Sequence, residues 1–354
     1  MVLSSYSVDR LVIASASVMA KAVLRKAIPF LLTLVANLTL SIGGDQLQAA
    51  EKLRAVYNAI GTGQSPLWIP HEAGIFRKYG VDVELLYVGS GSRTAQVVVS
   101  GEAPIGMFNG GLVVNANLAG ADLVVVADGL NVLPFFLVTA PRIKNINELK
   151  GQKIGITRFG SATEYALRYA AEKGSLRLGK ETPVLQLGGQ PEMMAALKNG
   201  LIEAAVLNPE FAILAAREGF NRLVDIGALG LAFPTSSLNT SRTFIQKKRD
   251  MVRQFVRAYV EGIHYAKTHR QFAIDVLRRY LRNEDVAFVA AVYEIYIVRL
   301  IPRVAHPSAD AMRTVLSQLA LKDPKIATIS PEQFLDRSFL QELEKERFIE
   351  TLWK

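Results

Sequence analysis

The chain has 354 residues and a formal net charge of +9, from 41 Lys and Arg residues against 32 Asp and Glu residues. Its composition is 50% hydrophobic and 21% charged, which excludes a disordered chain, a collagen-like repeat and a coiled coil. The absence of cysteine excludes disulfides, thiolate nucleophiles and Cys-based metal sites. A chain of this length predicts two globular domains that fold by packing alone.

The N-terminal segment has the charge and hydropathy pattern of a secretory signal peptide. Residues 27–44 are uncharged and strongly apolar at their centre, and Lys21, Arg25 and Lys26 precede them. A basic segment followed by an apolar one is typical of an export signal. We therefore assign residues 1–43 to a signal peptide and expect a periplasmic protein.

The N-terminal segment also leaves alternatives open. Residues 41–43 form a small-x-small cleavage site and residues 48–50 a less regular one, so the mature chain is predicted to begin between Gly44 and Glu51. Met19 would open a signal of ordinary length and is a possible true start. Because the 18 uncharged residues can just cross a bilayer, the alternative is an uncleaved segment that anchors the protein in the membrane.

Residues 53–108 are predicted to alternate between strands and helices. The strands are expected over residues 53–57, 81–88 and 104–108, from their apolar patterns. The helices are expected over residues 67–79 and 93–100, because Gly80 and Gly101 follow them as stop signals. The strands lead into loops rich in Gly, Ser and Asn.

The same series recurs about 100 residues later. Strands are expected over residues 153–157, 184–187 and 203–207, with helices over 162–173 and 192–199 that end at Gly174 and Gly200. Strands that alternate with helices of this length form parallel sheets. Two such series therefore predict an α/β protein with two lobes and a ligand cleft between them.

Two crossings of the chain would connect the lobes. The first is predicted within residues 131–143, where residues 135–139 are strand-like and Pro141 stops them, and the second near residues 230–239. We therefore predict a first lobe of residues 51–140 and 233–354 and a second lobe of residues 141–232. The first lobe would include the helical C-terminal region.

The C-terminal region is predicted to be mainly helical after Lys247. Met251, Phe255, Tyr259 and Ile263 repeat every four residues, which predicts one buried stripe. The basic residues 247–249, Arg253 and Arg257 follow helical spacing and are expected on a solvated face. No nucleic-acid partner is predicted, since no recognition motif accompanies the charge. A second solvated face is expected at Glu342, Glu344, Glu346 and Glu350.

Three ordered motifs carry a family resemblance. They are Ser65-Pro66-Leu67-Trp68, then Gly74-Ile75-Phe76-Arg77-Lys78-Tyr79-Gly80-Val81-Asp82-Val83, then Leu149-Lys150-Gly151-Gln152-Lys153-Ile154-Gly155-Ile156. With the export signal, they resemble the NitT/TauT branch (NMT1/THI5-like) of the periplasmic substrate-binding proteins of ABC importers. Members of that branch bind nitrate, taurine, alkanesulfonates, riboflavin or thiamin pyrimidine precursors.

The resemblance implies a fold, a function and partners. It implies a type II periplasmic binding protein fold that closes on a small molecule and delivers it to the permease subunits of an ABC transporter. It implies no enzyme activity and no cofactor, and we expect a monomer. The alternative is an enzyme on the same fold that acts on a thiamin-pyrimidine or sulfonate-type substrate, although the family enzymes that it resembles depend on Cys, which this chain lacks.

The loops that follow the strands predict the ligand site, because ligands of open α/β sheets bind beyond the carboxyl ends of the strands. Residues 161–164 read as a capping box, so Ser161 would begin a helix whose N–H groups favour an anion. Ser90 would play the same part in the first lobe. The full set of predicted ligand contacts is Gly63, Gln64, Ser65, Trp68, Ser90, Ser92, Arg93, Asn109, Gly110, Arg158, Phe159, Ser161, Thr163, Gln190, Asn208 and Glu210.

Several of these residues have a structural alternative. Asn109 and Asn208 follow equivalent strands and could bind a polar ligand, but Asn208 precedes Pro209 and could instead form an Asx turn. Arg93 and Arg158 could bind an anion or remain solvated. We predict that two of four aromatic residues enter the cleft and the rest are core, the four being Trp68, Phe108, Phe159 and Phe211.

The expected ligand is a small organic anion or a polar heteroaromatic molecule, such as a sulfonate, a carboxylate or a pyrimidine. If both Arg93 and Arg158 enter the cleft, a sulfonate or carboxylate is favoured, and if neither does, a neutral aromatic is favoured. No dinucleotide, phosphate-loop or nucleophile-elbow motif is present. The scattered histidines predict no metal site.

Overall fold

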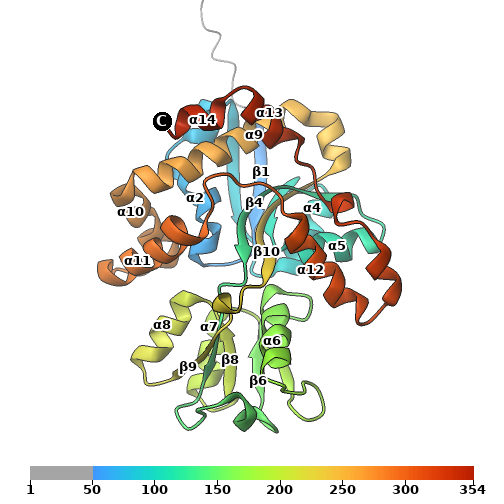
Figure 1. Cartoon of the computed structure of the whole chain (residues 1–354). Helices are drawn as coiled ribbons and strands as arrows, with labels where there is room; N and C mark the ends of the chain where they lie inside the picture. The colour runs from blue at the N-terminus through green and yellow to red at the C-terminus, as the bar shows by residue number, and fades with distance from the viewer. Residues whose placement is uncertain (1–50) are drawn as a thin grey trace, which may run out of the picture. The chain divides into compact units, whose positions relative to one another are not determined.

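The structure is a computed structural model, and it describes residues 51–354. These residues form one compact unit whose strands build two five-stranded sheets (Figure 1). The expected signal peptide and its cleavage sites fall in residues 1–50 and lie outside the described residues. Within residues 51–354, no helix is long and apolar enough to cross a membrane.

The first sheet has the strand order β2-β1-β3-β10-β4. β1 pairs in parallel with β2 and β3, whereas β10 runs antiparallel to β3 and β4. The strands are β1 (Glu51–Tyr57), β2 (Val81–Tyr87), β3 (Ile105–Phe108), β4 (Leu123–Val132) and β10 (Ala232–Ser241).

The second sheet repeats this plan with the order β7-β6-β8-β5-β9. β6 pairs in parallel with β7 and β8, and β5 runs antiparallel to β8 and β9. The predicted pair of α/β lobes is therefore confirmed. The strands of the second sheet are consecutive along the chain, whereas the first sheet receives β10 only after the second sheet is complete. The strands are β5 (Phe136–Thr139), β6 (Ile154–Ile156), β7 (Val184–Gln186), β8 (Ala204–Leu207) and β9 (Asn221–Asp225).

The helices of the repeated units follow their strands. In the first lobe they are η1 (Thr62–Gln64), α2 (Ser65–Glu72), α3 (Ile75–Lys78), α4 (Gly91–Val99) and α5 (Gly110–Leu118). In the second lobe they are η2 (Ile146–Leu149), α6 (Ala162–Lys173), α7 (Gln190–Lys198) and α8 (Pro209–Arg217). The single helix expected over residues 67–79 is instead two helices, because Gly74 adopts a left-handed conformation (φ 69°) that interrupts it.

The chain crosses between the sheets at residues 133–135 and again at residues 226–231, where η3 (Gly227–Leu229) lies. The boundary expected at residue 140 comes after β5. Phe136 to Thr139 already pair with β8 and β9, so their strand hydrogen bonds belong to the second sheet. β10 returns to the first sheet from Ala232, next to the boundary expected at residue 233.

Helices of the C-terminal region cover the first sheet (Figure 1). The stripe predicted on α9 is confirmed, since Phe255, Tyr259 and Ile263 are buried against the core. At Gly262, a Cβ atom would lie 2.6 Å from Pro70, so glycine permits the close packing of α9 on α2. The elements are α9 (Arg242–Thr268), α10 (Arg270–Leu281), α11 (Val286–Tyr293), the π-helix η4 (Glu294–Leu300), α12 (Ala309–Ala320), η5 (Pro324–Thr328), η6 (Pro331–Phe334), α13 (Ser338–Lys345) and α14 (Phe348–Leu352).

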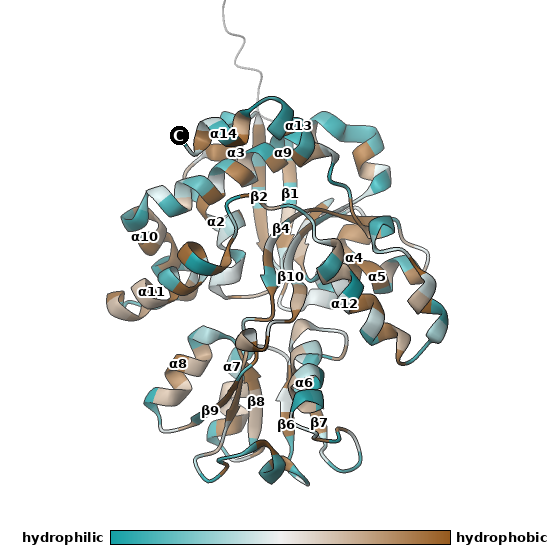
Figure 2. Cartoon of the chain, in the orientation of Figure 1, coloured by the Kyte–Doolittle hydropathy of each residue, from teal (hydrophilic) through white to brown (hydrophobic). Residues whose placement is uncertain are grey.

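The apolar core lies along the strands. Figure 2 shows hydrophobic residues on the strands of both sheets and hydrophilic ones on the outer faces of the surrounding helices. One cluster fills the space between the first sheet and helices α2, α9, α10 and α11. A second cluster runs from the opposite face of that sheet through Leu133 and Phe135 to α6 of the second lobe. Apolar packing is thus continuous through the first crossing.

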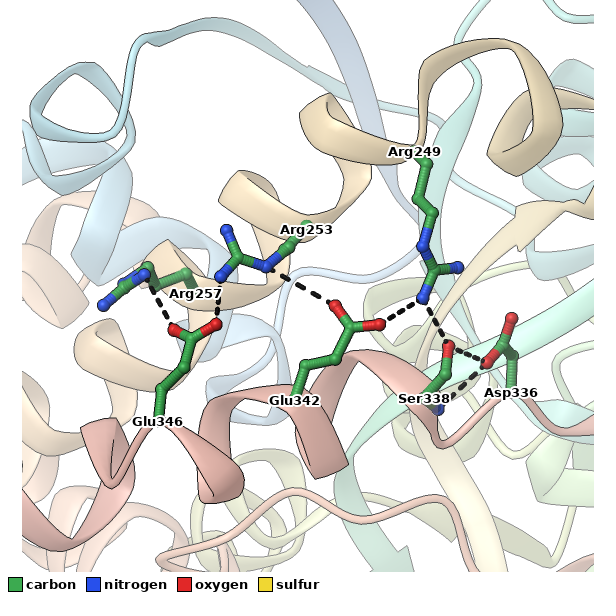
Figure 3. A network of polar contacts seen from close by, with 7 residues as sticks. All are labelled: Arg249, Arg253, Arg257, Asp336, Ser338, Glu342 and Glu346. Atoms are coloured by element: carbon green, nitrogen blue, oxygen red, sulfur yellow. Dashed lines mark hydrogen bonds and ion pairs between the residues drawn. The ribbon is translucent and has the colours of Figure 1, made fainter.

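The basic face of α9 is paired, which corrects the expectation of two separately solvated faces. Arg253 contacts Glu346 and also Glu342, with Arg253 Nε 3.4 Å from Glu342 Oε2. Arg249 pairs with Glu342, and Arg257 Nη1 lies 3.2 Å from Glu346 Oε2 (Figure 3). The two faces point toward each other because α13 packs on α9, so the ion pairs hold the C-terminal segment on the first lobe.

Asp128 on β4 gives a first testable prediction. Its carboxylate is 1% exposed and accepts a hydrogen bond from the Ser308 N–H at 2.9 Å. Burial raises its pKa from 3.8 to about 6, so the folded chain binds a proton that the unfolded chain releases in this range. Ionisation of Asp128 therefore costs stability as the pH rises through this interval.

We expect Asp128→Asn to become more stable relative to the natural chain as the pH rises from 4 to 7. The difference in unfolding free energy should grow by about 3 kcal/mol, the equivalent of about two pKa units. Urea denaturation of both proteins at each pH measures it. A difference that does not change with pH would show that Asp128 has the same pKa in the folded and unfolded chains.

Candidate functional site

A cavity of about 460 Å³ lies at the carboxyl ends of the parallel strands and is lined from both lobes. Asn58, Ser90 and Asn109 follow β1, β2 and β3, and Arg158, Gly189 and Asn208 follow β6, β7 and β8. The remaining lining includes residues of the first crossing, of β10 and of η4. Equivalent loops of the two repeats therefore face one space.

Many of the predicted contacts lie on the wall of this cavity. They are Gly63, Gln64, Ser90, Ser92, Asn109, Arg158, Ser161, Thr163, Gln190 and Asn208. Each follows a parallel strand or begins the helix after it, which is the position where open α/β sheets bind their ligands.

Other predicted residues lie away from the cavity. Arg93 is the third residue of α4, where the helical rotation turns its side chain to the exposed surface. Ser65 is buried at the start of α2, and Gly110 begins α5 with its Cβ position against Pro234. Glu210 is buried behind the cavity wall, where it bonds to Thr62 and Tyr296.

None of the four predicted aromatic candidates lines the cavity. Trp68 is fully buried and stacks on Tyr280 at 4.6 Å between ring centroids, so it belongs to the core of the first lobe. Phe159 is 48% exposed, Phe108 is core, and Phe211 packs on the apolar cluster of the second lobe. Aromatic residues enter the site from other elements instead.

These aromatic residues, and some polar residues of the cavity wall, are absent from the predicted set of ligand contacts. Tyr87 ends β2, Phe135 lies in the first crossing and Tyr296 comes from η4, and all three line the cavity. Asn58 directly follows β1 and could have been found by the rule that located Asn109. Tyr296 had no local signal, because its place depends on how η4 packs against the first lobe.

Two of the helices that begin at the cavity cap their own N-termini. Asn109 Oδ1 accepts from the Leu112 N–H at 3.3 Å, and Asn208 Oδ1 accepts from the Phe211 N–H at 3.1 Å. Both side chains are therefore N-caps, which resolves the alternative raised for Asn208 in favour of backbone capping by its oxygen. Its Nδ2 donates to none of the described residues.

The other helix N-termini are not capped in this way. Ser90 precedes α4, whose first turn has no acidic residue, and its buried Oγ has no partner among residues 51–354. Ser161 does not form the expected capping box, because its Oγ donates to the Arg158 carbonyl at 2.6 Å. Glu164 instead accepts from the Gly160 N–H and pairs with Arg168. Because Ser90 does not cap α4, the free N–H groups at the start of that helix are available to a ligand.

Unpartnered polar atoms gather on the wall of the cavity. Asn58 Oδ1, Gln64 Oε1, Ser90 Oγ and Arg158 Nε are buried and have no hydrogen-bond partner in the described part of the chain. Arg158 forms no ion pair with any residue of 51–354, although Glu192, which is exposed on the first turn of α7, lines the same cavity. Buried polar groups require partners, so this set defines where a polar ligand would bind.

Asn208 gives a second prediction, which separates its two groups. We expect Asn208→Ala to lose about 0.5–2 kcal/mol of stability, because the cap of α8 is removed. Asn208→Ser keeps a capping oxygen and removes the amide donor, so its stability should change little while ligand affinity falls by up to about tenfold. Thermal unfolding and calorimetric titration measure the two effects. Full affinity in the Ser variant would leave Asn208 with the capping role alone.

The two repeated sheets with a cavity between them define the class of two-lobed periplasmic binding proteins. A structure from Bordetella bronchiseptica RB50 is similar, with a TM-score of 0.72 and 18% identity over 85% of this chain and 98% of that one. The family model described as NMT1/THI5 like matches residues 62–273, and the chain belongs to this family. A comparison with curated protein sequences gives no match.

Two further solved structures share the fold. The alkanesulfonate-binding protein SsuA from Xanthomonas axonopodis pv. citri, bound to MOPS, has a TM-score of 0.68 and 17% identity over 81% of this chain and 98% of that one. The periplasmic nitrate-binding protein NrtA from Synechocystis PCC 6803 has a TM-score of 0.71 and 12% identity over 83% and 88%. At these identities the likeness establishes the fold.

Proposed function

We propose that the chain is an extracytoplasmic solute-binding protein that captures a small organic anion between its lobes and delivers it to an ABC permease. The observation that carries this proposal is the cavity between the lobes. Its wall includes both Arg158 of the second lobe and the uncapped N-terminus of α4 of the first lobe. The family and the fold of the solved neighbours support it.

The anionic part of the ligand is argued from charge. The free N–H groups at the start of α4 and the helix dipole favour a negative group there. Arg158 supplies a full positive charge with no competing carboxylate paired to it in residues 51–354. Of the two arginines considered as ligand contacts, Arg158 lines the cavity and Arg93 lies outside it. One arginine at the site favours a ligand with a single anionic group.

The rest of the ligand is argued from volume and lining. About 460 Å³ falls in the range of organic ligand pockets and is far more than a nitrate or other small inorganic ion would fill. The lining also includes the apolar residues Leu130, Pro134 and Phe135, and Tyr87 and Tyr296 add aromatic rings. We therefore propose a sulfonate or carboxylate whose apolar or heteroaromatic body contacts these residues.

Native mass spectrometry of the protein purified from its own host tests the proposal directly. We expect a non-covalent adduct of one organic anion, released when the protein is denatured. A thermal-shift series of sulfonates, carboxylates, flavins and pyrimidines then ranks the classes, since a ligand that binds only the folded state raises the melting temperature.

Small-angle scattering with the recovered ligand tests the transport role. Ligand that contacts both lobes favours the closed state, so the radius of gyration should fall on saturation. The competing function is an enzyme on the same fold. A constant radius together with the appearance of a chemical product would establish that alternative and remove the transport proposal.

A further inference from the structure

A buried carboxylate connects the two lobes behind the cavity. Glu210 is the second residue of α8 in the second lobe and is 3% exposed. Its Oε1 accepts a hydrogen bond from the Thr62 N–H at 2.6 Å, and Thr62 belongs to η1 of the first lobe. Its Oε2 accepts from the Tyr296 hydroxyl at 3.1 Å, on η4 of the same lobe. Each carboxylate oxygen therefore has a partner across the cleft.

Tyr296 brings this contact to the ligand site. Its side chain is 3% exposed and lies on the cavity wall, and it is part of a π-helix, an element often found at functional sites. The Lys267 ammonium donates to the carbonyls of Ile297 and Val298, which fixes the turn that follows. The segment that follows Tyr296 is thus held by α9, and the ring is held at its hydroxyl by Glu210.

We propose that Glu210 is a positioning residue of the cleft, whose carboxyl group joins α8 to η1 and η4 when the lobes close and thereby sets the Tyr296 ring against the ligand. The contact with ligand rests on the proposed function, whereas the joining of the lobes does not. A second contact between the lobes, the ion pair of Arg217 with Asp285 at 2.9 Å, is exposed and contributes less.

The surroundings of Glu210 make this contact sensitive to protons. Burial is the largest influence on its pKa and raises it, and the hydrogen bonds from Thr62, from its own N–H and from Tyr296 lower it by less. Tyr296 is the titratable group that faces it from η4, and η1 brings none. The charged residues nearby act elsewhere, since Arg158 and Glu192 line the cavity and Arg217 pairs with Asp285.

The sign of the effect follows from linkage. When the lobes separate, Glu210 reaches solvent and its pKa returns toward the ordinary value of 4.5. Between that value and the raised pKa, the closed form binds a proton that the open form releases, so a lower pH favours closure. Both hydrogen bonds survive protonation, because the carboxyl group can accept from Thr62 with one oxygen and donate to the Tyr296 oxygen with the other.

Distance measurements on ligand-free protein test the proposal. Because the chain has no cysteine, Gln96→Cys on α4 and Ala195→Cys on α7 provide unique sites for spin labels on exposed helix faces, one in each lobe. Pulsed electron paramagnetic resonance then gives the closed and open populations between pH 5 and pH 8. In the labelled natural chain, the closed-to-open ratio should rise as the pH falls, by up to about tenfold per unit.

Four variants in the labelled chain separate the roles. Glu210→Gln stays neutral and hydrogen-bonded, so it should remain closed at every pH. Glu210→Ala should be mostly open without pH dependence, and Tyr296→Phe should be less closed while still responding to pH. Glu218→Gln, an exposed carboxylate at the other end of α8, is the control and should behave as the natural chain.

The inference is wrong if Glu210→Ala keeps the distances and the pH response of the natural chain. This test does not depend on the proposed ligand, because the distances are measured on ligand-free protein. A finding that the protein binds no anion would therefore leave the role of Glu210 in joining the lobes unaffected. Conversely, a chain that closes through Glu210 but yields a chemical product overturns the proposed function alone.

Discussion

Arg158→Ala should weaken the binding of the anionic ligand by about ten- to hundredfold, because a hydrogen bond to a charged group contributes about 1.5–3 kcal/mol. Arg158 lines the cavity, and its Nε has no partner among residues 51–354. The fold should be unaffected, since the side chain is partly exposed and holds no other element. Calorimetric titration with the anion recovered from the natural protein measures the loss.

Arg93→Ala is the matched control for this loss. Arg93 lies in the first turn of α4 in the other lobe, on the exposed surface outside the cavity. Its removal should leave affinity within about twofold. Arg158→Lys adds a further comparison, since it keeps the charge and loses the planar fork that binds a carboxylate or sulfonate through two donors. If the Arg93 and Arg158 variants bind equally well, the anionic subsite is not at Arg158.

Trp68→Ala should lower the free energy of unfolding by about 3–5 kcal/mol, the cost of removing a large buried aromatic side chain. Trp68 is fully buried, stacks on Tyr280 and meets the edge of Tyr57 at 5.6 Å. Trp68→Phe should cost less, because the indole N–H has no hydrogen-bond partner within the described residues. Urea denaturation monitored by circular dichroism measures both variants.

Phe159→Ala is the control for the other aromatic candidate. Phe159 is 48% exposed, so its removal should change stability by no more than about 0.5 kcal/mol. Ligand affinity of the folded Trp68→Phe protein should match that of the natural chain. A loss of affinity without loss of stability in that variant would return Trp68 to the ligand site.

Local patterns were sufficient where an element is stabilised by its own sequence. The spacing of Phe255, Tyr259 and Ile263 predicted the buried face of α9, since helical periodicity alone brings these residues to one side. The glycine after each helix and the short apolar runs located most strands of both repeats. The cavity could be placed from the strand ends for the same reason, because a parallel sheet gathers its carboxyl ends at one edge.

The orientation of single side chains was not accessible in this way. Arg93 and Arg158 both come shortly after a parallel strand, yet Arg93 is turned to the surface by its position in α4 and Arg158 reaches the cavity. Ser161 fits a capping box, but its hydroxyl bonds to the Arg158 carbonyl instead. Such choices depend on competing partners that local spacing does not specify.

The sequence by itself determined the composition class, the twofold repeat of α/β units and the strand ends that line the cleft. Tertiary structure alone decided which distant residues meet. Tyr296 reaches the cavity and Glu210, and the arginines of α9 find Glu342 and Glu346, across separations of about 90 residues. Local periodicity places a residue on a face of its own element, whereas contacts of this kind are set by how whole elements pack against each other.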